Sequence, residues 1–301
     1  MGHGYVVFDN NAYKRMSSER LERIQAAEGE HGIIPLANVV VLQELLARVR
    51  DPDTPRRGPN RAAIRKLGRH CRSVQGDRPA VTFLSHVESQ VYRFLSGRPH
   101  PSDHAWFDLL GDMVRVVSEA DGDDPLEVIA EQLHEVERIV QRVESEYVER
   151  LRAAAAEAGE QNEMKRNLNY AARLASRTQK LYGEEFPPEV VIQRVMDIAK
   201  LSSIGFKLWD SVVAEVRSKG GGHAQHANTV WDEEVVSSTS MYTQIGGLSV
   251  LLVTEEARLI RAATSALAAD RVSNLATYEA SLGLSQWVPA PRQEKPPGPS
   301  C

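Results

Sequence analysis

Four acidic residues, far apart in the sequence, stand where a carboxylate can take part in chemistry. Asp9 directly follows the apolar run YVVF, and Glu256 closely follows the run LSVLLV. In open α/β sheets, ligands bind at the carboxyl ends of the strands. Glu44 lies among leucines in an apolar helical segment, where an unpaired charge is costly, and Asp232 lies near the start of a predicted helix. These settings make the four acids candidates for one shared site.

Each acid also has an ordinary structural explanation. Asp9 would be a favourable cap for the helix that follows it, because Asp and Asn are preferred N-caps. Asp232 would offset the dipole of its helix, and Glu44 would lie half-exposed at a helix edge. Because two of the acids come just after predicted buried strands, we interpret Asp9 as a site residue.

Clustered carboxylates of this kind favour a bound cation. Like charges at close range disfavour each other's ionised forms, and hard oxygen ligands select Mg²⁺ or Mn²⁺. Such ions activate a water molecule and stabilise the leaving oxygen of a phosphodiester. We expect Asp9, Asp232 and Glu256 to be metal ligands. Glu44 would bind the ion through water or position the attacking water, and Asn11 would bond a carboxylate or a phosphate oxygen.

The segments that hold the acids resemble the motifs of PIN-domain nucleases. VVFDNNAYKRM resembles their opening motif, in which a strand is followed by Asp, any residue and Asn, and VVVLQELLARV resembles their helix with a glutamate before a leucine pair. NTVWDEEVVSSTSM resembles a helix opened by an aspartate. GGLSVLLVTEEARLIRAA resembles a strand that ends in Thr, any residue and an acid. The resemblance covers residues 4–70 and 228–285.

The resemblance implies a catalytic acidic cluster that also binds the metal, with two polar neighbours: Asp9, Glu44, Asp232 and Glu256, with Asn11 and Thr254. It also implies a three-layer α/β/α core with a central parallel sheet, and hydrolysis that leaves a 5′-phosphate. The fourth acid is Glu256 where the family usually has Asp, and the adjacent Glu255 is an alternative for that role. The family core is compact, so the resemblance does not explain a large helical block.

Two α/β pieces bracket such a block in this chain. Residues 1–72 and 228–287 combine short apolar strands with helices, and we expect them to form one discontinuous core. Residues 73–227 have a helical pattern, clearest where apolar residues alternate steps of three and four. The stretch at 51–60, rich in Pro, Gly and Asp, is expected to be a loop. The proline-rich tail at 288–301 is expected to be disordered.

A basic stripe and a histidine pair are candidates for substrate binding. If residues 61–72 are helical, four arginines share one face, namely Arg61, Arg65, Arg69 and Arg72. In a chain of net charge −5, this is the footprint expected for phosphate contacts, although a solvated face, or one that pairs with the acidic inserted helices, would look the same. His223 and His226 have a spacing seen in zinc ligands, but no third ligand is nearby. The simplest interpretation is a glycine-rich loop with incidental histidines, and substrate contact is the better of the functional options because the pair comes just before Asp232.

Composition and termini exclude several other classes. With 42% hydrophobic residues over 301 positions, the chain can bury a substantial core. Its two cysteines are too few for a disulfide framework or a cysteine-built metal site. No apolar run approaches the roughly 20 residues that cross a bilayer, and the N-terminal residues lack the features of a signal peptide. We therefore expect no membrane partner and a cytoplasmic location.

These features predict an Mg²⁺- or Mn²⁺-dependent endoribonuclease acting on single-stranded or structured RNA, in a toxin, defence or RNA-processing role. The inserted helices would serve in homo-oligomerisation, protein docking or substrate selection. The alternative is a non-catalytic interaction protein that keeps the core while its helices bind a partner. A phosphatase of the haloacid-dehalogenase type is disfavoured, because Asn11 stands where its second Asp belongs.

Overall fold

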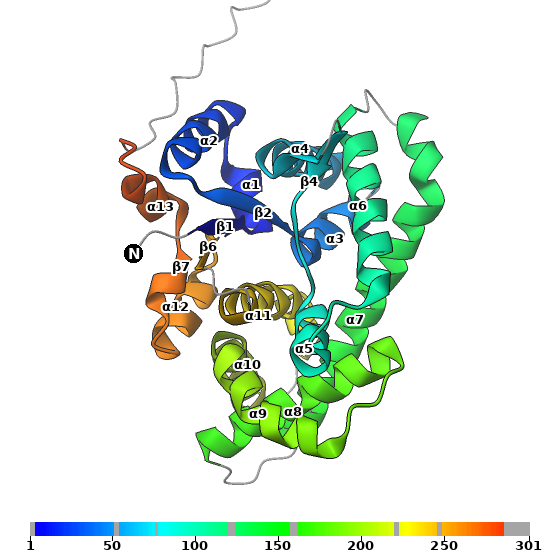
Figure 1. The fold of residues 1–301 in the computed structure, drawn as a ribbon, viewed down its shortest axis with the longest axis vertical. Coiled ribbons are helices and arrows are strands. Elements are labelled where there is room, and N and C mark those ends of the chain that lie inside the picture. Colours follow the sequence, from blue (N-terminus) through cyan, green and yellow to red (C-terminus); the bar gives the residue numbers. More distant parts are fainter. Residues whose placement is uncertain are drawn as a thin grey trace, which may run out of the picture.

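The chain folds around a small parallel sheet and is otherwise mostly helical (Figure 1). The computed structural model describes residues 4–50, 54–75, 78–119, 124–156, 162–219, 223–245 and 249–285. The expected combination of a parallel sheet with a large helical part is thereby confirmed.

Among the described residues, five strands form the main sheet in the order β5-β2-β1-β6-β7. The strands are β1 (Tyr5–Phe8), β2 (Ile34–Asn38), β5 (Phe83–Leu84), β6 (Val250–Val253) and β7 (Val272–Ser273). Every pairing between them is parallel. Because β1 pairs with both β2 and β6, the two ends of the chain share one sheet. The residues that follow β1 and β6 therefore meet at the same edge.

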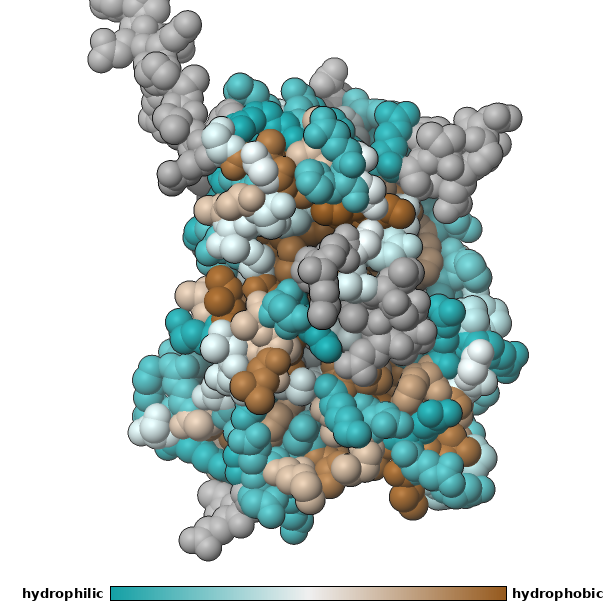
Figure 2. Space-filling model, turned by 60° about the vertical axis from the view of Figure 1, so that its left-hand side comes forward, coloured by the Kyte–Doolittle hydropathy of each residue, from teal (hydrophilic) through white to brown (hydrophobic). Residues whose placement is uncertain are grey.

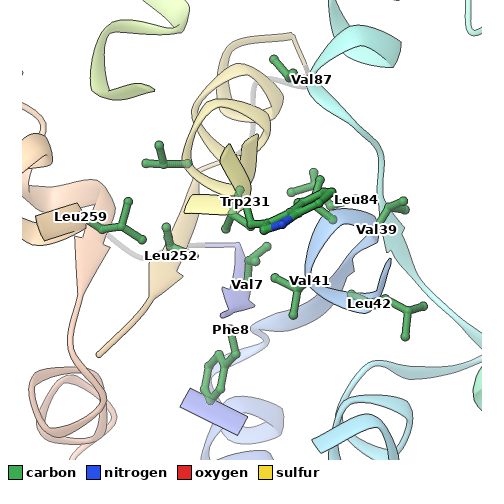
Figure 3. Close-up of a cluster of buried hydrophobic side chains, with 14 of the residues drawn as sticks. Val7, Phe8, Val39, Val41, Leu42, Leu84, Val87, Trp231, Leu252 and Leu259 are labelled. Atoms are coloured by element: carbon green, nitrogen blue, oxygen red, sulfur yellow. The ribbon is translucent and has the colours of Figure 1, made fainter. Parts of the chain in front are cut away.

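Helices cover both faces of this sheet. In Figure 1, α2 (Ser18–His31), α4 (Thr54–His70) and α13 (Leu275–Ser281) lie on one side, and α11 (Thr229–Ile245) and α12 (Ala257–Ser265) lie on the other. Side chains of β1 alternate between these layers: Phe8 packs against the rings of His70 and Tyr278. Val7 points the other way, toward α11, as Figure 3 shows. Burial on both faces explains why β1 is an uninterrupted apolar run.

Helix α3 (Val39–Ala47) and the 3₁₀ turn η3 (Ala269–Arg271) also belong to the core. The helices between the two core segments form a block that packs directly on it. They are α5 (Val87–Ser96), α6 (Pro101–Glu119), α7 (Ala130–Ala156), α8 (Glu163–Tyr182), α9 (Pro188–Leu201) and α10 (Ser203–Lys219), with the 3₁₀ turns η1 (Asp124–Ile129) and η2 (His223–His226). Helix α7 packs on α3, and α10 packs on α11 and α12. The predicted apolar seam is the buried face of α7, including Leu133, Val136 and Val140.

Two stretches differ from the sequence expectation. Strand β5 and the antiparallel pair β3 (Arg72–Gln75) and β4 (Arg78–Val81) lie within the range expected to be helical, and β5 extends the main sheet beside β2. The loop expected at 51–60 is wrong from Thr54 onward, because α4 begins there. Pro55 lies in the first turn of α4, where main-chain N–H groups have no partner within the helix, so the missing N–H of proline costs no hydrogen bond. The expected disorder at 288–301 concerns residues outside the described ranges.

A buried hydrogen-bond chain holds α1 (Asn10–Arg15) behind the sheet edge. The hydroxyl of Tyr13 bonds His70 Nδ1 at 3.0 Å, and His70 Nε2 lies 2.8 Å from Glu28 Oε2. Tyr278 donates to the other oxygen of Glu28 at 2.7 Å. Lys66 donates to the main-chain oxygen of Tyr13 at 2.9 Å. Helices α2, α4 and α13 are thus linked by hydrogen bonds to α1, the segment that begins where strand β1 ends.

The outer surface is largely polar on the face that Figure 2 shows, where hydrophilic residues predominate and apolar ones gather in small separate groups. Among the described residues, no helix is both long and apolar enough to cross a bilayer.

Candidate active site

A cavity of about 230 Å³ lies where the strands end, and all four acids that the sequence singled out line it. They come from four different places: Asp9 follows β1, Glu44 lies in α3, Asp232 lies in the first turn of α11, and Glu256 precedes α12. Asn11, on α1, lines the same cavity. The structure therefore brings together residues from both ends of the chain.

Asp9 is both a helix cap and a cavity residue. Its carboxylate accepts the main-chain N–H of Ala12 at 2.6 Å, as an N-cap of α1, and also accepts the hydroxyl of Thr254. Burial raises the pKa of Asp9 to about 7, and the nearby charges of Glu256 and Glu44 act in the same direction. The two hydrogen bonds oppose this shift but do not cancel it. The capping role and the site role belong to one side chain.

Of the two neighbouring glutamates, Glu256 is the one that faces the cavity. Asn11 donates to Glu256 Oε1 at 2.5 Å, and the main-chain N–H of Glu256 donates to the Thr254 hydroxyl at 3.0 Å. Glu255 points elsewhere: it accepts the N–H of Leu275 at 3.0 Å, at the start of α13. Thr254 thus links Asp9 to the Glu256 segment, in agreement with its expected position as a polar neighbour.

Asp232 and Glu44 each form an ion pair with an arginine. Arg258 Nη2 lies 2.5 Å from Asp232 Oδ2, and Arg48 Nη1 lies 3.3 Å from Glu44 Oε1. Burial nevertheless raises the pKa of Asp232 to about 7: Arg258 lowers it, and the charges of the other three acids raise it. The four carboxylates therefore share one electrostatic environment.

The donor set fits a hard divalent cation. Carboxylate and amide oxygens are the ligands that Mg²⁺ and Mn²⁺ prefer, and Asn10 adds a buried side-chain oxygen that has no hydrogen-bond partner in the described structure. Within the described ranges, however, no three acidic, His or Cys side chains already stand in a metal-binding arrangement. Three of the acids instead contact Arg258, Arg48 and Asn11. A metal ion would have to replace some of them.

The cavity also contains residues that the sequence reasoning missed. Three cations line it, namely Lys14, Arg48 and Arg258, together with Trp231 and Asn228. Burial lowers the pKa of Lys14. The signal was present in part, because Lys14 belongs to the same segment as Asp9, and Arg48 follows Glu44 by one helical turn. In the sequence, the acids were considered, but not the cations that accompany them.

The predicted substrate-binding arginines do not line this cavity. Helix α4 ends at His70, so Arg72 lies in β3 and does not share a helical face with Arg61, Arg65 and Arg69, which corrects that expectation. Arg69 pairs with Glu22 at 3.0 Å on the exposed side of α4. The contact fits the alternative of a solvated, ion-paired face.

His226 is not among the described residues that line the cavity. His226 is buried in η2 beside Gln225, and the side chain of His223 lies outside the described part of the structure. Their expected contact with substrate therefore stays a prediction without support from the geometry.

Fold and cavity together define an α/β protein with an acidic, cation-lined site at the carboxyl edge of a parallel sheet. No protein-family model, curated protein or solved structure matches the chain. The resemblance to PIN-domain nucleases therefore rests on the four motifs themselves.

Proposed function

We propose that this chain is an Mg²⁺- or Mn²⁺-dependent endoribonuclease of the PIN-domain type. One observation carries the proposal: Asp9, Glu44, Asp232 and Glu256, which were selected by sequence pattern alone, line a single cavity. A structural cap or a solvated acid has no reason to share a cavity with three others. Like charges at such a site disfavour ionisation unless a cation joins them.

The acids would hold the ion, with Asp9, Asp232 and Glu256 as ligands and Glu44 as a ligand through water. The ion would supply Lewis-acid activation of water and stabilisation of the leaving oxygen. Asn10 offers a further oxygen, since its side-chain carbonyl is buried at the cavity without a partner in the described structure.

The other cavity residues would orient the acids and the substrate. Thr254 and the N–H of Ala12 fix the carboxylate of Asp9 from two sides, and Asn11 fixes Glu256. Lys14 and Arg48 would neutralise the charge of the phosphodiester, because both line the cavity. Glu44 would hold the attacking water by accepting its proton in a hydrogen bond. These roles follow from position and chemistry.

The cavity has room for one phosphodiester and its ion, at a volume of about 230 Å³. The substrate class that we propose is single-stranded or structured RNA.

The test is a cleavage assay with variants of matched design. Purified protein is incubated with end-labelled single-stranded RNA, and with DNA of the same sequence, in Mn²⁺, Mg²⁺ or EDTA. Asp9→Asn and Asp232→Asn should abolish metal-dependent cleavage. Asp210→Asn is the control, because Asp210 pairs with Arg166 between α8 and α10 and does not line the cavity. Equal degradation by all four proteins would indicate contamination and would contradict the proposal.

A non-catalytic interaction protein is the second candidate, and the ion pairs of the cavity favour it. Arg258 and Arg48 already neutralise two of the four acids. In that case Mn²⁺ titration by calorimetry would show no binding, no RNA would be cleaved, and the helical block would be the surface to test for homo-oligomerisation or for a protein partner.

A further inference from the structure

Arg258 contacts one of the proposed metal ligands, Asp232, at the cavity. It lies on α12, and its guanidinium contacts Asp232 at 2.5 Å and donates to the hydroxyl of Thr229 at 3.0 Å. Both contacts are on α11, so Arg258 also ties two helices together. Arg258 itself lines the cavity.

The carboxylate of Asp232 needs a positive partner in this position. Its side chain is 18% exposed, and three further acids line the same cavity. A buried carboxylate without a counter-charge is costly, and repulsion from neighbouring acids adds to the cost. Arg258 supplies the counter-charge, and a guanidinium cannot lose its proton at any pH that the protein survives.

A divalent ion and Arg258 would therefore compete for the same carboxylate. Arg258 contacts Oδ2 of Asp232, so an ion bound to this carboxylate would meet the charge of the same guanidinium. The side chain of Arg258 is 37% exposed and already reaches solvent, whereas that of Arg20, which binds Glu279, is 16% exposed.

We propose that Arg258 is a built-in counter-cation, which neutralises Asp232 in the metal-free protein and is displaced when a divalent ion binds. This inference rests on the proposed function, since it requires that the cavity bind a metal. The displaced guanidinium stays beside the cavity, because α12 begins there. Its planar set of donors matches two oxygens of a phosphate. Metal binding would thus free Arg258 to hold the substrate.

The test uses Mn²⁺ alone as the probe, in calorimetric titrations of the full chain without substrate. Arg258→Gln removes the competing charge and should bind Mn²⁺ roughly tenfold more tightly than the wild type. Arg258→Lys keeps the charge and should stay near the wild-type affinity. The Lys variant also serves if the Gln variant folds poorly.

Thermal unfolding gives a second measurement that does not depend on activity. Without metal, Arg258→Gln should lower Tm, because Asp232 loses its counter-charge; with saturating Mn²⁺ the deficit should shrink. Arg20→Gln is the matched control. It breaks the contacts with Glu279 at 2.6 and 2.8 Å, away from the cavity, and should lower Tm equally with and without Mn²⁺ while leaving the affinity for Mn²⁺ unchanged.

Two results would overturn the inference and are distinguishable. If Arg258→Gln binds Mn²⁺ no more tightly than the wild type and loses the same Tm in both states, Arg258 only joins α12 to α11, while the proposed function stands. If no version of the protein binds Mn²⁺, the proposed function fails and the displacement fails with it.

Discussion

The indole N–H of Trp231 donates to Glu144 at 2.8 Å, and this bond joins the candidate site to the helical block. Trp231 lies on α11 and lines the cavity, whereas Glu144 lies on α7. The same oxygen of Glu144 is 3.8 Å from the guanidinium of Arg48, a second cavity residue. Figure 3 shows Trp231 projecting from α11 toward α3. Helix α7 therefore holds part of the cavity wall, although it lies outside the sheet core.

This contact predicts that Glu144 acts as a positioning residue. Glu144→Ala removes the acceptor of the Trp231 indole and the charge beside Arg48, so we expect kcat/KM for RNA to fall roughly tenfold, the usual effect of a residue that orients site groups. Glu144→Gln keeps an acceptor for the indole and should recover most of the loss. Glu149→Ala, on the exposed side of α7, is the control, since Glu149 pairs only with Arg152 among the described residues. An unchanged kcat/KM in Glu144→Ala would show that the helical block does not act on the site.

The buried carboxylate of Asp9 predicts a dependence of stability on pH. Its pKa is about 7 in the folded chain and 3.8 as an ordinary Asp, so the folded state binds this proton more tightly than the unfolded state. Stability from the protonated group is complete below about pH 4 and is lost as pH rises through 7. Asp9→Asn stays neutral and can still cap α1. It should therefore exceed the wild type by roughly 2–4 kcal/mol at pH 8 in EDTA.

Urea unfolding of both proteins in EDTA, at pH 5 and at pH 8, checks this expectation. The advantage of Asp9→Asn should shrink at pH 5, where the wild-type carboxyl is mostly protonated. A difference that is the same at both pH values would mean that Asp9 titrates like an exposed acid, and the electrostatic coupling of the cavity would have to be abandoned.

The clustering of the acids could be predicted from the sequence, because a simple rule determines where residues after parallel strands lie. Asp9 and Glu256 come just after buried apolar strands, and parallel strands place such residues at one edge. The break between α1 and α2 has a local cause: Ser17 caps the second helix by accepting the N–H of Arg20. Local polar residues compete with helix continuation in ways that apolar periodicity does not record.

The rest of the site depends on contacts that no local pattern specifies. Arg258 meets Asp232 only because α12 and α11 pack side by side, and Glu144 meets Trp231 only because the helical block folds onto the core. Strands β5 and β7 contain two residues each, too few to show any alternation. The predicted basic stripe included Arg72, but the helix ends before that residue. Tertiary packing, not propensity, decided each of these points.

We predict that the hydroxyl of Thr254 stabilises the acidic site and its binding of metal. It is fully buried, donates to Asp9 and accepts the N–H of Glu256. Thr254→Val keeps the shape of the side chain but leaves the N–H of Glu256 and the Asp9 oxygen without that partner. We expect the free energy of unfolding to fall by roughly 1–3 kcal/mol. The affinity for Mn²⁺ should fall roughly tenfold or more. Thr254→Ser keeps the hydroxyl and is the matched variant. If Ser and Val behave alike in calorimetry and urea unfolding, the methyl group and not the hydroxyl matters.

We predict that Lys14 is one of the cations that bind the nucleic-acid backbone. It lines the cavity, and among the described residues it has no hydrogen bond or ion pair, whereas Arg69 on the basic stripe is paired with Glu22. We therefore expect Lys14→Ala to weaken the binding of single-stranded RNA in EDTA, where no cleavage occurs, and to lower the slope of log affinity against log salt by about 1. Arg65→Glu with Arg69→Glu tests the stripe in the same assay. A flatter salt dependence in that double variant, with Lys14→Ala indistinguishable from the wild type, would place the backbone along α4 instead of in the cavity.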